Sequence, residues 1–272
     1  MAHTYADVAS FKNFLLSDGV TDFGTVDDGA ILRVLEGSSR RVDGFTGRTR
    51  SGFGPRIASN VYDHDGSDFL DLDDDFIAVT SVTSAASTGE AAGTLVADDD
   101  YLTRPTFGPI RELIFPGLGT STIGSGYGVI TAVGTAGYSL ETVNLGTMGT
   151  VTASATAGTL TAGLAYPGMT LLADAEQMYV TAATGGTALT LVRGVNGTTA
   201  AVHAASTTVY QYRYDRAVEL ATHLVAQRRW RQKEAGVTGD FGGGAMPFGG
   251  HRDTERSILN AEVGHLRLFE AM

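Results

Sequence analysis

Apolar residues recur every three or four positions near both ends of the chain, which predicts amphipathic α-helices there. A first helix is expected over residues 4–19. Thr4 and Asp7 have the spacing of a capping box at its start, and Gly19 is a natural stop. The apolar face of this helix consists of Val8, Phe11 and Leu15.

A second helix is expected over residues 27–47. Thr25 and Asp28 have capping-box spacing at its start, and Gly47 supplies the stop. Its buried stripe is predicted to contain Ile31, Leu35, Ser38, Val42 and Phe45. Three arginines, Arg33, Arg40 and Arg41, fall largely outside that stripe.

Helical periodicity returns near the C-terminus, over residues 214–236 and 253–269. The apolar face of the first of these predicted helices consists of Ala217, Val218, Ala221, Leu224 and Val225. The apolar face of the second consists of Ile258, Leu259, Val263, Leu266 and Phe269. Between them, residues 237–251 are rich in glycine, so their composition predicts a flexible segment.

Between the helical ends, short runs of β-type residues alternate with Asp and Gly turns. We therefore expect an α+β fold in which a discontinuous helical bundle, formed by residues 1–56 and 213–272, carries two β parts. Residues 57–149 form a β-hairpin or sheet region. Residues 150–212, which are denser in Thr and Gly, form an inserted small β-sandwich or barrel-like module.

Composition and charge narrow the classes of function. The chain has 272 residues, of which 43% are hydrophobic, and it has no cysteine, so disulfides and thiolate chemistry are excluded. No signal-peptide pattern and no apolar run long enough to span a membrane is present, so no membrane partner is expected. The net charge of −11 argues against a surface that coats nucleic acid.

The charge is unevenly distributed along the chain. Residues 1–212 contain 10 Lys and Arg against 22 Asp and Glu, a balance of −12, whereas residues 213–272 contain 9 against 8, a balance of +1. All basic residues except Lys12 and Lys233 are arginines, which favour fork-shaped ion pairs at interfaces.

The stretch RGVNGTTAAVHAAS, residues 193–206, suggests several kinds of site. It lacks the lysine and the spacing of a phosphate-binding loop. The triplet at Asn196 is a glycosylation acceptor only in a secreted chain. His203 has no carboxylate near it in sequence. We therefore interpret the stretch as a strand that enters a tight turn, where Asn196 and Gly197 adopt positive φ.

Two charged stretches are also candidates for function. The first, YDHDGSDFLDLDDDF at residues 62–76, does not fit an EF-hand loop and is interpreted as a solvated hairpin turn with charged flanks, with a bound metal as the alternative. The second, QRRWRQK at residues 227–233, is either a helix C-terminus whose cations suit the dipole or a surface for a protein partner, ahead of DNA.

No Ser–His–acid set, paired-carboxylate context or histidine cluster stands out in the sequence. We therefore expect no enzyme, no cofactor and no catalytic or metal site.

The order of motifs resembles that of the head-tail adaptor (connector) proteins of long-tailed bacteriophages. The resemblance is carried by ASFKNFLL, DDGAILRVLEGSSRRVDGFTGR, YDHDGSDFLDLDDDFIAVTSVT, ADDDYLTRP and YDRAVELATHLVAQRRWRQKEAG, in this sequence. The stretch LTLVRGVNGTTAAVHAASTTV also looks like a β segment that recurs in phage virion proteins.

The resemblance implies a structural virion protein at the head-tail junction, or neck, assembled in the host cytoplasm. It implies a homo-oligomeric ring, commonly a dodecamer, bound beneath the portal protein and above a stopper or tail-completion protein. Double-stranded DNA would pass through the channel during ejection without sequence-specific binding, and an acidic body would not retard it.

Candidate contact residues follow from this role. For contacts between subunits we expect Arg33, Arg40 and Arg41. For the subunit or portal interface we expect residues of the last two helices and of the glycine-rich segment between them: Arg228, Arg229, Trp230, Arg231, Lys233, Phe241, Met246, Phe248, Arg252, Arg256, Leu266 and Phe269.

Two rival interpretations remain open. A β-rich minor tail, neck-decoration or tail-completion protein of the virion would use the β module as its functional part. A carbohydrate-binding or hydrolytic β protein would need an aromatic platform or paired acids, whereas the one tryptophan, Trp230, lies in a predicted helix.

Overall fold

The computed structural model describes residues 4–17, 28–49, 52–117, 119, 121–238 and 249–267, with the backbone alone over 232–238 and 249–254. The chain forms two compact units. We call Arg50–Leu140 the sheet unit, and Met1–Thr49 together with Glu141–Met272 the helix–barrel unit. The division into three parts drawn from the sequence stays a prediction about which parts fold independently.

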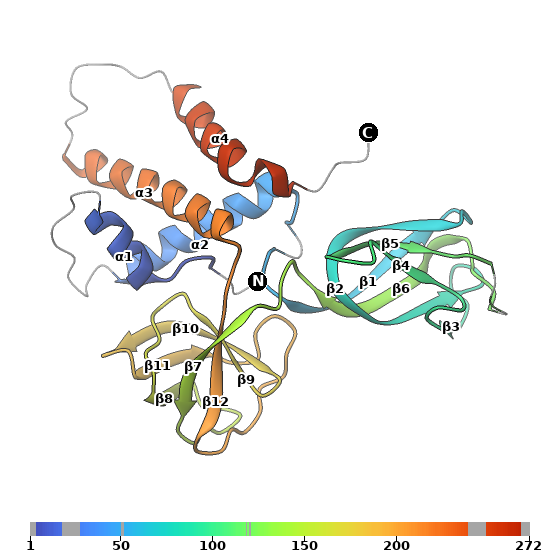
Figure 1. Ribbon diagram of the computed structural model, residues 1–272, viewed down its shortest axis with the longest axis horizontal. Coiled ribbons are helices and arrows are strands. Elements are labelled where there is room, and N and C mark those ends of the chain that lie inside the picture. Colours follow the sequence, from blue (N-terminus) through green and yellow to red (C-terminus); the bar gives the residue numbers. More distant parts are fainter. Residues whose placement is uncertain are drawn as a thin grey trace. The chain divides into compact units, whose positions relative to one another are not determined.

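Within the described residues, the helix–barrel unit contains four helices (Figure 1): α1 (Val8–Ser17), α2 (Asp28–Thr46), α3 (Arg216–Thr238) and α4 (Gly249–Val263), with a short 3₁₀ turn, η2 (Gly264–Leu266), after α4. Helix α2 packs against α3, and α3 against α4. The predicted stripe of α2 is confirmed for Ile31, Leu35, Ser38 and Val42, which are buried, whereas Phe45 is half-buried.

The start of α1 differs from the expected cap. Asp7, not Thr4, caps the helix: its Oδ1 accepts a hydrogen bond from the Ser10 amide at 2.9 Å, and the Ser10 hydroxyl accepts one from the Asp7 amide at 3.2 Å. The Thr4 hydroxyl instead donates to the Gly168 carbonyl. The predicted boundary residues Gly19 and Thr25 lie outside the described residues.

Six strands close into an antiparallel barrel in the order β10-β11-β8-β7-β12-β9. They are β7 (Thr142–Met148), β8 (Ala157–Ala162), β9 (Thr170–Ala173), β10 (Glu176–Thr184), β11 (Ala188–Val192) and β12 (Thr207–Tyr212). The barrel has its own core, which includes Met148, Leu171, Met178, Leu191 and Val209. The expected α+β class with a barrel-like module is therefore confirmed.

A second core joins the helices to the barrel within the helix–barrel unit. Phe11, Leu35 and Trp230 from the helices pack in one cluster with Tyr179 and Val195 from the barrel. The Tyr179 hydroxyl also donates to Glu36 Oε1 of α2 at 2.9 Å. Because both parts share this core, we expect them to unfold together.

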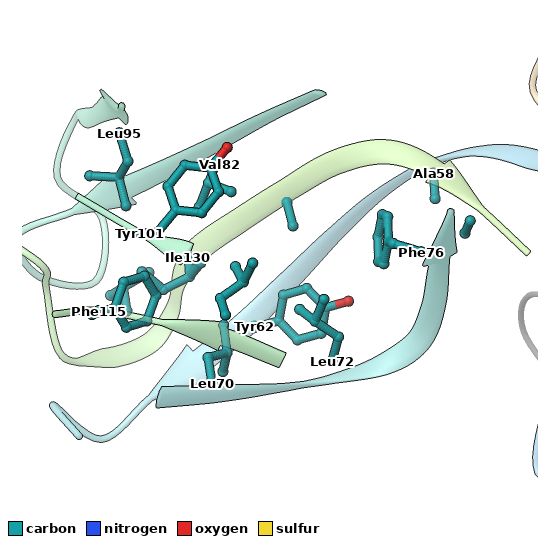
Figure 2. Packing of buried hydrophobic residues seen from close by; sticks show 14 residues of the cluster. Ala58, Tyr62, Leu70, Leu72, Phe76, Val82, Leu95, Tyr101, Phe115 and Ile130 are labelled. Carbon is teal, nitrogen blue, oxygen red and sulfur yellow. The ribbon is translucent and has the colours of Figure 1, made fainter. Parts of the chain in front are cut away.

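The sheet unit is an antiparallel sheet in the order β1-β6-β2-β5-β4, with β3 paired to β2. Its strands are β1 (Arg56–His64), β2 (Phe69–Ala85), β3 (Ala92–Leu95), β4 (Leu102–Arg104), β5 (Ile110–Ile114) and β6 (Gly126–Ala136). Tyr62, Leu72, Phe76 and Ile130 belong to its core, which Figure 2 shows from close by.

Candidate functional site

Arg193, which follows β11, is the centre of a buried ionic network in the barrel. Its guanidinium donates two hydrogen bonds to Glu176, from Nε at 2.7 Å and from Nη2 at 2.6 Å. Three further bonds go to the carbonyls of Thr152, Ala155 and Ala201. All five N–H groups of this side chain, which is only 6% exposed, are thus used within the barrel.

Glu176, the first residue of β10, is the acceptor that these groups share. Its carboxylate, 1% exposed, also accepts from the amides of Gly194 and Ala201 and from the His203 ring. Burial would raise the pKa of Glu176, but the hydrogen bonds from Arg193, Ala201, His203 and Gly194 lower it to about 2. The carboxylate therefore stays ionised throughout the physiological range.

His203 is held between two carboxylates. Its Nε2 lies 2.8 Å from Glu176 Oε2, and its Nδ1 lies 2.9 Å from Asp174 Oδ2. Because both ring nitrogens are engaged in this way, the ring is not placed to activate a hydroxyl. We call Asp174, Glu176, Arg193 and His203 the barrel network. Its hydrogen bonds and ion pairs hold the loop after β11 in place.

The interpretation of this loop as a tight turn is confirmed. Asn196 and Gly197 have φ of 58° and 83°, the left-handed values that Asn and Gly tolerate. The side-chain amide of Asn196 also donates a hydrogen bond from Nδ2 to Gln177 Oε1 at 2.9 Å, which holds the turn against β10. The carboxylate partners of His203 could not be predicted from its neighbours in sequence, because they lie 27 and 29 residues away.

The acidic stretch of the sheet unit is only partly solvated, which corrects the sequence interpretation. Asp74 and Asp75 are buried within β2, where Arg56 Nη2 lies 2.6 Å from Asp74 and Arg111 Nε lies 2.6 Å from Asp75. The register of β2 against β5 shifts between Asp71 and Phe76, so strict alternation breaks and consecutive residues turn inward. The flanking strands β1 and β2 are also not hairpin partners, because β6 lies between them.

The turn between β1 and β2 is fixed by His64. Its Nδ1 lies 2.8 Å from the Gly124 carbonyl and its Nε2 lies 3.0 Å from the Ser67 carbonyl. The acids of this turn, Asp63 and Asp65, are exposed. In the described part of the chain, no group of three or more His, Asp or Glu side chains is arranged to hold a metal ion.

The predicted interface residues of α3 divide between core and surface. Trp230 is 4% exposed and packs in the core shared by helices and barrel, so its ring is not a surface anchor in this structure. Arg231 is exposed, and Arg228 is half-buried. Arg229 Nη2 lies 3.4 Å from Glu255 Oε1 of α4.

The arginines of α2 divide in a similar way. Arg41 Nε lies 2.9 Å from Glu255 Oε1, so Arg41 and Arg229 hold α4 through the same carboxylate. Arg40 Nη1 lies 2.9 Å from Asp43 Oδ2. Arg33 is exposed and makes no hydrogen bond or ion pair with another residue in the described ranges.

The remaining predicted contact residues lie near the C-terminus. Arg256 is exposed, whereas Leu266 is buried and its carbonyl accepts a hydrogen bond from Arg48. Phe241, Met246, Phe248 and Phe269 lie outside the described residues, as do the side chains of Lys233 and Arg252. Their roles stay predictions.

An open groove of about 710 Å³ lies on the helix–barrel unit and was not foreseen from the sequence. Its lining includes Phe14, Val143, Leu220 and His223, with Arg213 and Arg216 among its charged residues. We call these six residues the arginine groove. Two carboxylates, Glu141 and Glu219, also line it.

The position of the two groove arginines is a signal that sequence reasoning could have used. Arg216 is the first residue of α3 and Arg213 precedes it by three, so both lie where the helix dipole disfavours positive charge. Neither guanidinium makes a hydrogen bond or close ion pair with any described residue, although both lower the pKa of Glu219 electrostatically. Burial, reinforced by Asp7, has the larger effect and raises that pKa above its ordinary value.

His223 lines the groove and is nearly buried. Its ring stacks on Phe14 with centroids 5.0 Å apart, and burial lowers its pKa to about 4. The ring is therefore neutral at physiological pH, and its Nε2 lies 3.3 Å from the Ser10 hydroxyl.

The fold and its surfaces define an α+β protein with a closed antiparallel barrel fused to a helical bundle, and with a separate acidic sheet. No protein-family model matches the chain, and no curated protein matches it. Among the described helices, none is both long and apolar enough to cross a membrane.

Two solved structures are similar to the chain. A chain of the "Neck of empty GTA particle computed with C6 symmetry" shares 12% identity at a TM-score of 0.45, with 98% of this chain and 92% of that chain covered. A chain of the "Neck of native GTA particle computed with C12 symmetry" shares 13% identity at a TM-score of 0.44, with 97% and 90% covered. With identities and TM-scores this low, the similarity assigns neither a family nor a function.

Proposed function

We propose that the chain is a structural subunit of a bacteriophage neck, a head-tail adaptor that forms a ring under the portal and joins it to the stopper or tail. The proposal rests on one face of the sheet unit. This face carries no charged side chains and ends at a strand edge that pairs with no other described strand, although the sheet unit is the more acidic of the two units. The order of sequence motifs, which resembles that of head-tail adaptors, supports the particular place in the particle.

The uncharged face lies across β1, β6 and β2. Cross-strand pairing brings three rows of side chains together, each free of charge. The rows are Ile57–Thr135–Ala78, Ser59–Val133–Ser81 and Val61–Thr131–Thr83. Ile57 and Val61 are 49% and 61% exposed. Interface cores are depleted of charge in this way.

The edge of the same face is open. Among the described strands, β1 pairs only with β6, so one side of a nine-residue strand presents unpaired backbone groups. The outward positions of β1 before Asp63 carry no charge, and the strand contains no proline or lysine, the devices that blunt exposed edges. This combination supports a chain whose sheet is covered by another protein in its working state.

The charge of the sheet unit fits a channel through which DNA slides. Residues 50–140 contain 4 Lys and Arg against 12 Asp and Glu, a balance of −8, so the other residues carry −3 of the total −11. A surface of this sign repels phosphate and would not hold the DNA during ejection. No catalytic role is proposed.

The proposal is tested by mixing the purified chain with portal protein from the same phage and imaging the complexes as single particles. We expect a closed ring bound to the portal. Binding to tail components without binding to the portal would contradict the adaptor role and favour a minor tail, decoration or tail-completion protein.

A matched pair of variants tests the uncharged face. Val61→Lys places a charge at its edge and is expected to reduce complex formation. Val96→Lys places the same charge at a valine that is 55% exposed but outside the face, and is expected to leave assembly unchanged. Equal assembly of both variants would show that the face is not an interface.

A further inference from the structure

Seven arginines in the described part of the chain form ion pairs within it. They pair with an Asp or Glu of the same chain and are Arg40, Arg41, Arg56, Arg104, Arg111, Arg193 and Arg229. Arg213 and Arg216 make none, and both line one groove. A guanidinium is well suited to pair with a carboxylate from another molecule.

The floor of the arginine groove is apolar and accessible. Leu220 is 37% exposed and Val143 is 41% exposed, and the stacked rings of Phe14 and His223 lie beside them. The groove therefore combines apolar side chains with two arginines that form no ion pair with a described residue, beside the carboxylates Glu141 and Glu219. The apolar side chains and the two guanidinium groups fit a partner segment that carries aromatic and acidic side chains together.

The sheet unit carries a surface of this chemistry. Around the turn between β1 and β2, Asp63, Asp65, Phe69, Asp71 and Tyr127 line a common surface depression, and we call these residues the acidic end. Tyr127 is 80% exposed and Phe69 is 52% exposed. None of the three carboxylates makes an ion pair with a basic side chain among the described residues.

We propose that the arginine groove of one copy of the chain binds the acidic end of a neighbouring copy, with Arg213 and Arg216 paired to its carboxylates and Tyr127 placed on the apolar floor. This inference rests on the proposed function, because it names the contact that closes the ring. The two surfaces are different, and the guanidinium groups of the groove complement the carboxylates of the acidic end, so each copy uses one surface toward each neighbour. Such a heterologous contact generates a ring when the rotation closes.

The absence of cysteine from the sequence allows a direct test in the full-length chain. Tyr127→Cys and Leu220→Cys are introduced together, the chain is mixed with portal protein, and the complexes are oxidised and separated on a denaturing gel. We expect a ladder of covalent multimers, because each copy is linked to two neighbours. Each single-cysteine variant is expected to give dimers at most.

A matched control replaces the groove position by Val192→Cys, on the barrel surface, where 47% of the side chain is exposed. With Tyr127→Cys, this variant is expected to give no ladder. A crosslink that forms only within one copy, or no crosslink while the ring is present, would overturn the proposal.

Charge exchange provides a second test that does not depend on disulfide geometry. Arg213→Glu with Arg216→Glu is expected to reduce the yield of rings on the portal by at least about tenfold, because like charges then face each other. Asp68→Arg with Asp71→Arg, which changes exposed acids at and beside the acidic end, is expected to do the same. The chain that carries all four changes is expected to recover ring formation.

The outcomes separate this contact from the function on which it rests. A wild-type chain that forms no ring on the portal would overturn the proposed function and the contact together. A wild-type ring that the Arg213→Glu and Arg216→Glu changes leave intact would overturn the contact alone.

Discussion

Replacement of Arg193 by methionine tests whether the barrel network stabilises the helix–barrel unit. Methionine keeps much of the length of the side chain and removes its charge and all five N–H groups. Glu176 then remains as a carboxylate that is 1% exposed, with three donors in place of five, and three backbone carbonyls lose a partner. Loss of one partner from a buried ion pair costs about 3–5 kcal/mol.

A loss of this size is a large fraction of the stability of a natural domain, which is about 5–15 kcal/mol. The helix–barrel unit has 181 residues, 49 before and 132 after the sheet unit. For a unit of that size we expect Tm to fall by roughly 6–20 °C.

The assay is fluorescence-monitored unfolding in urea and on heating. Trp230 is the sole tryptophan, and it packs against both helices and barrel residues, so its emission reports this unit. The control is Arg104→Met, which removes an exposed ion pair with Glu112 in the sheet unit. It is expected to change the Trp230 transition by less than about 0.5 kcal/mol.

The double variant Arg193→Met with Glu176→Gln identifies the origin of the loss. If the cost comes from an uncompensated charge, the double variant is destabilised by less than the sum of the single variants. A loss below about 1 kcal/mol for Arg193→Met, or strict additivity, would refute the reasoning.

Three further predictions concern stability. Burial lowers the pKa of His223 from 6.5 to about 4, so the neutral ring's contribution to the free energy of unfolding is complete above pH 6.5 and is lost as the pH falls to 4. In urea titrations at a series of pH values, the wild type should lose about 3 kcal/mol over this range relative to His223→Leu. Equal pH profiles would contradict this. Gly134→Ala should destabilise the sheet unit, because the added Cβ would lie 2.1 Å from the Ala78 carbonyl oxygen; far-UV circular dichroism should then show early loss of strand signal with the Trp230 transition unchanged. Asp7→Ala removes the cap of α1 and should cost about 1 kcal/mol in the Trp230 transition, and no measurable change would argue against the cap.

The helices could be predicted because their signal is local. In α2, the spacing of Ile31, Leu35 and Val42 specifies one face, and that face is buried. The tight turn at Asn196 and Gly197 was predictable for the same reason, since both residue types favour the required φ.

The interior charges could not be predicted, because the partners are distant in sequence. Glu176 and Arg193 are 17 residues apart, and Asp75 and Arg111 are 36 apart. A run such as DLDDD is solvated in most contexts, and only the register shift of β2 turns part of it inward. Its arginine neighbours make Trp230 a candidate interface residue in the sequence, yet the helical period places it on the buried side.

The strand β7 belongs to the barrel, although the sequence pattern groups its residues with the β region of residues 57–149. Thr142–Met148 contains Asn144 and Gly146, which are poor strand residues. Its pairing with β12, whose residues lie 59 to 70 positions after their partners, places it in the barrel. Closure of a barrel is a property of such distant pairings and leaves little trace in local composition.

The core shared by helices and barrel also sets an order of events during synthesis. Helices α1 and α2 leave the ribosome first, but their core partners Tyr179, Val195 and Trp230 are synthesised much later. At bacterial-type elongation rates, the 184 residues from Gly47 to Trp230 take roughly 10–40 s to make. The whole sheet unit is synthesised within that interval. The acidic sheet can therefore fold before the apolar faces of α1 and α2 have barrel and α3 residues to pack against.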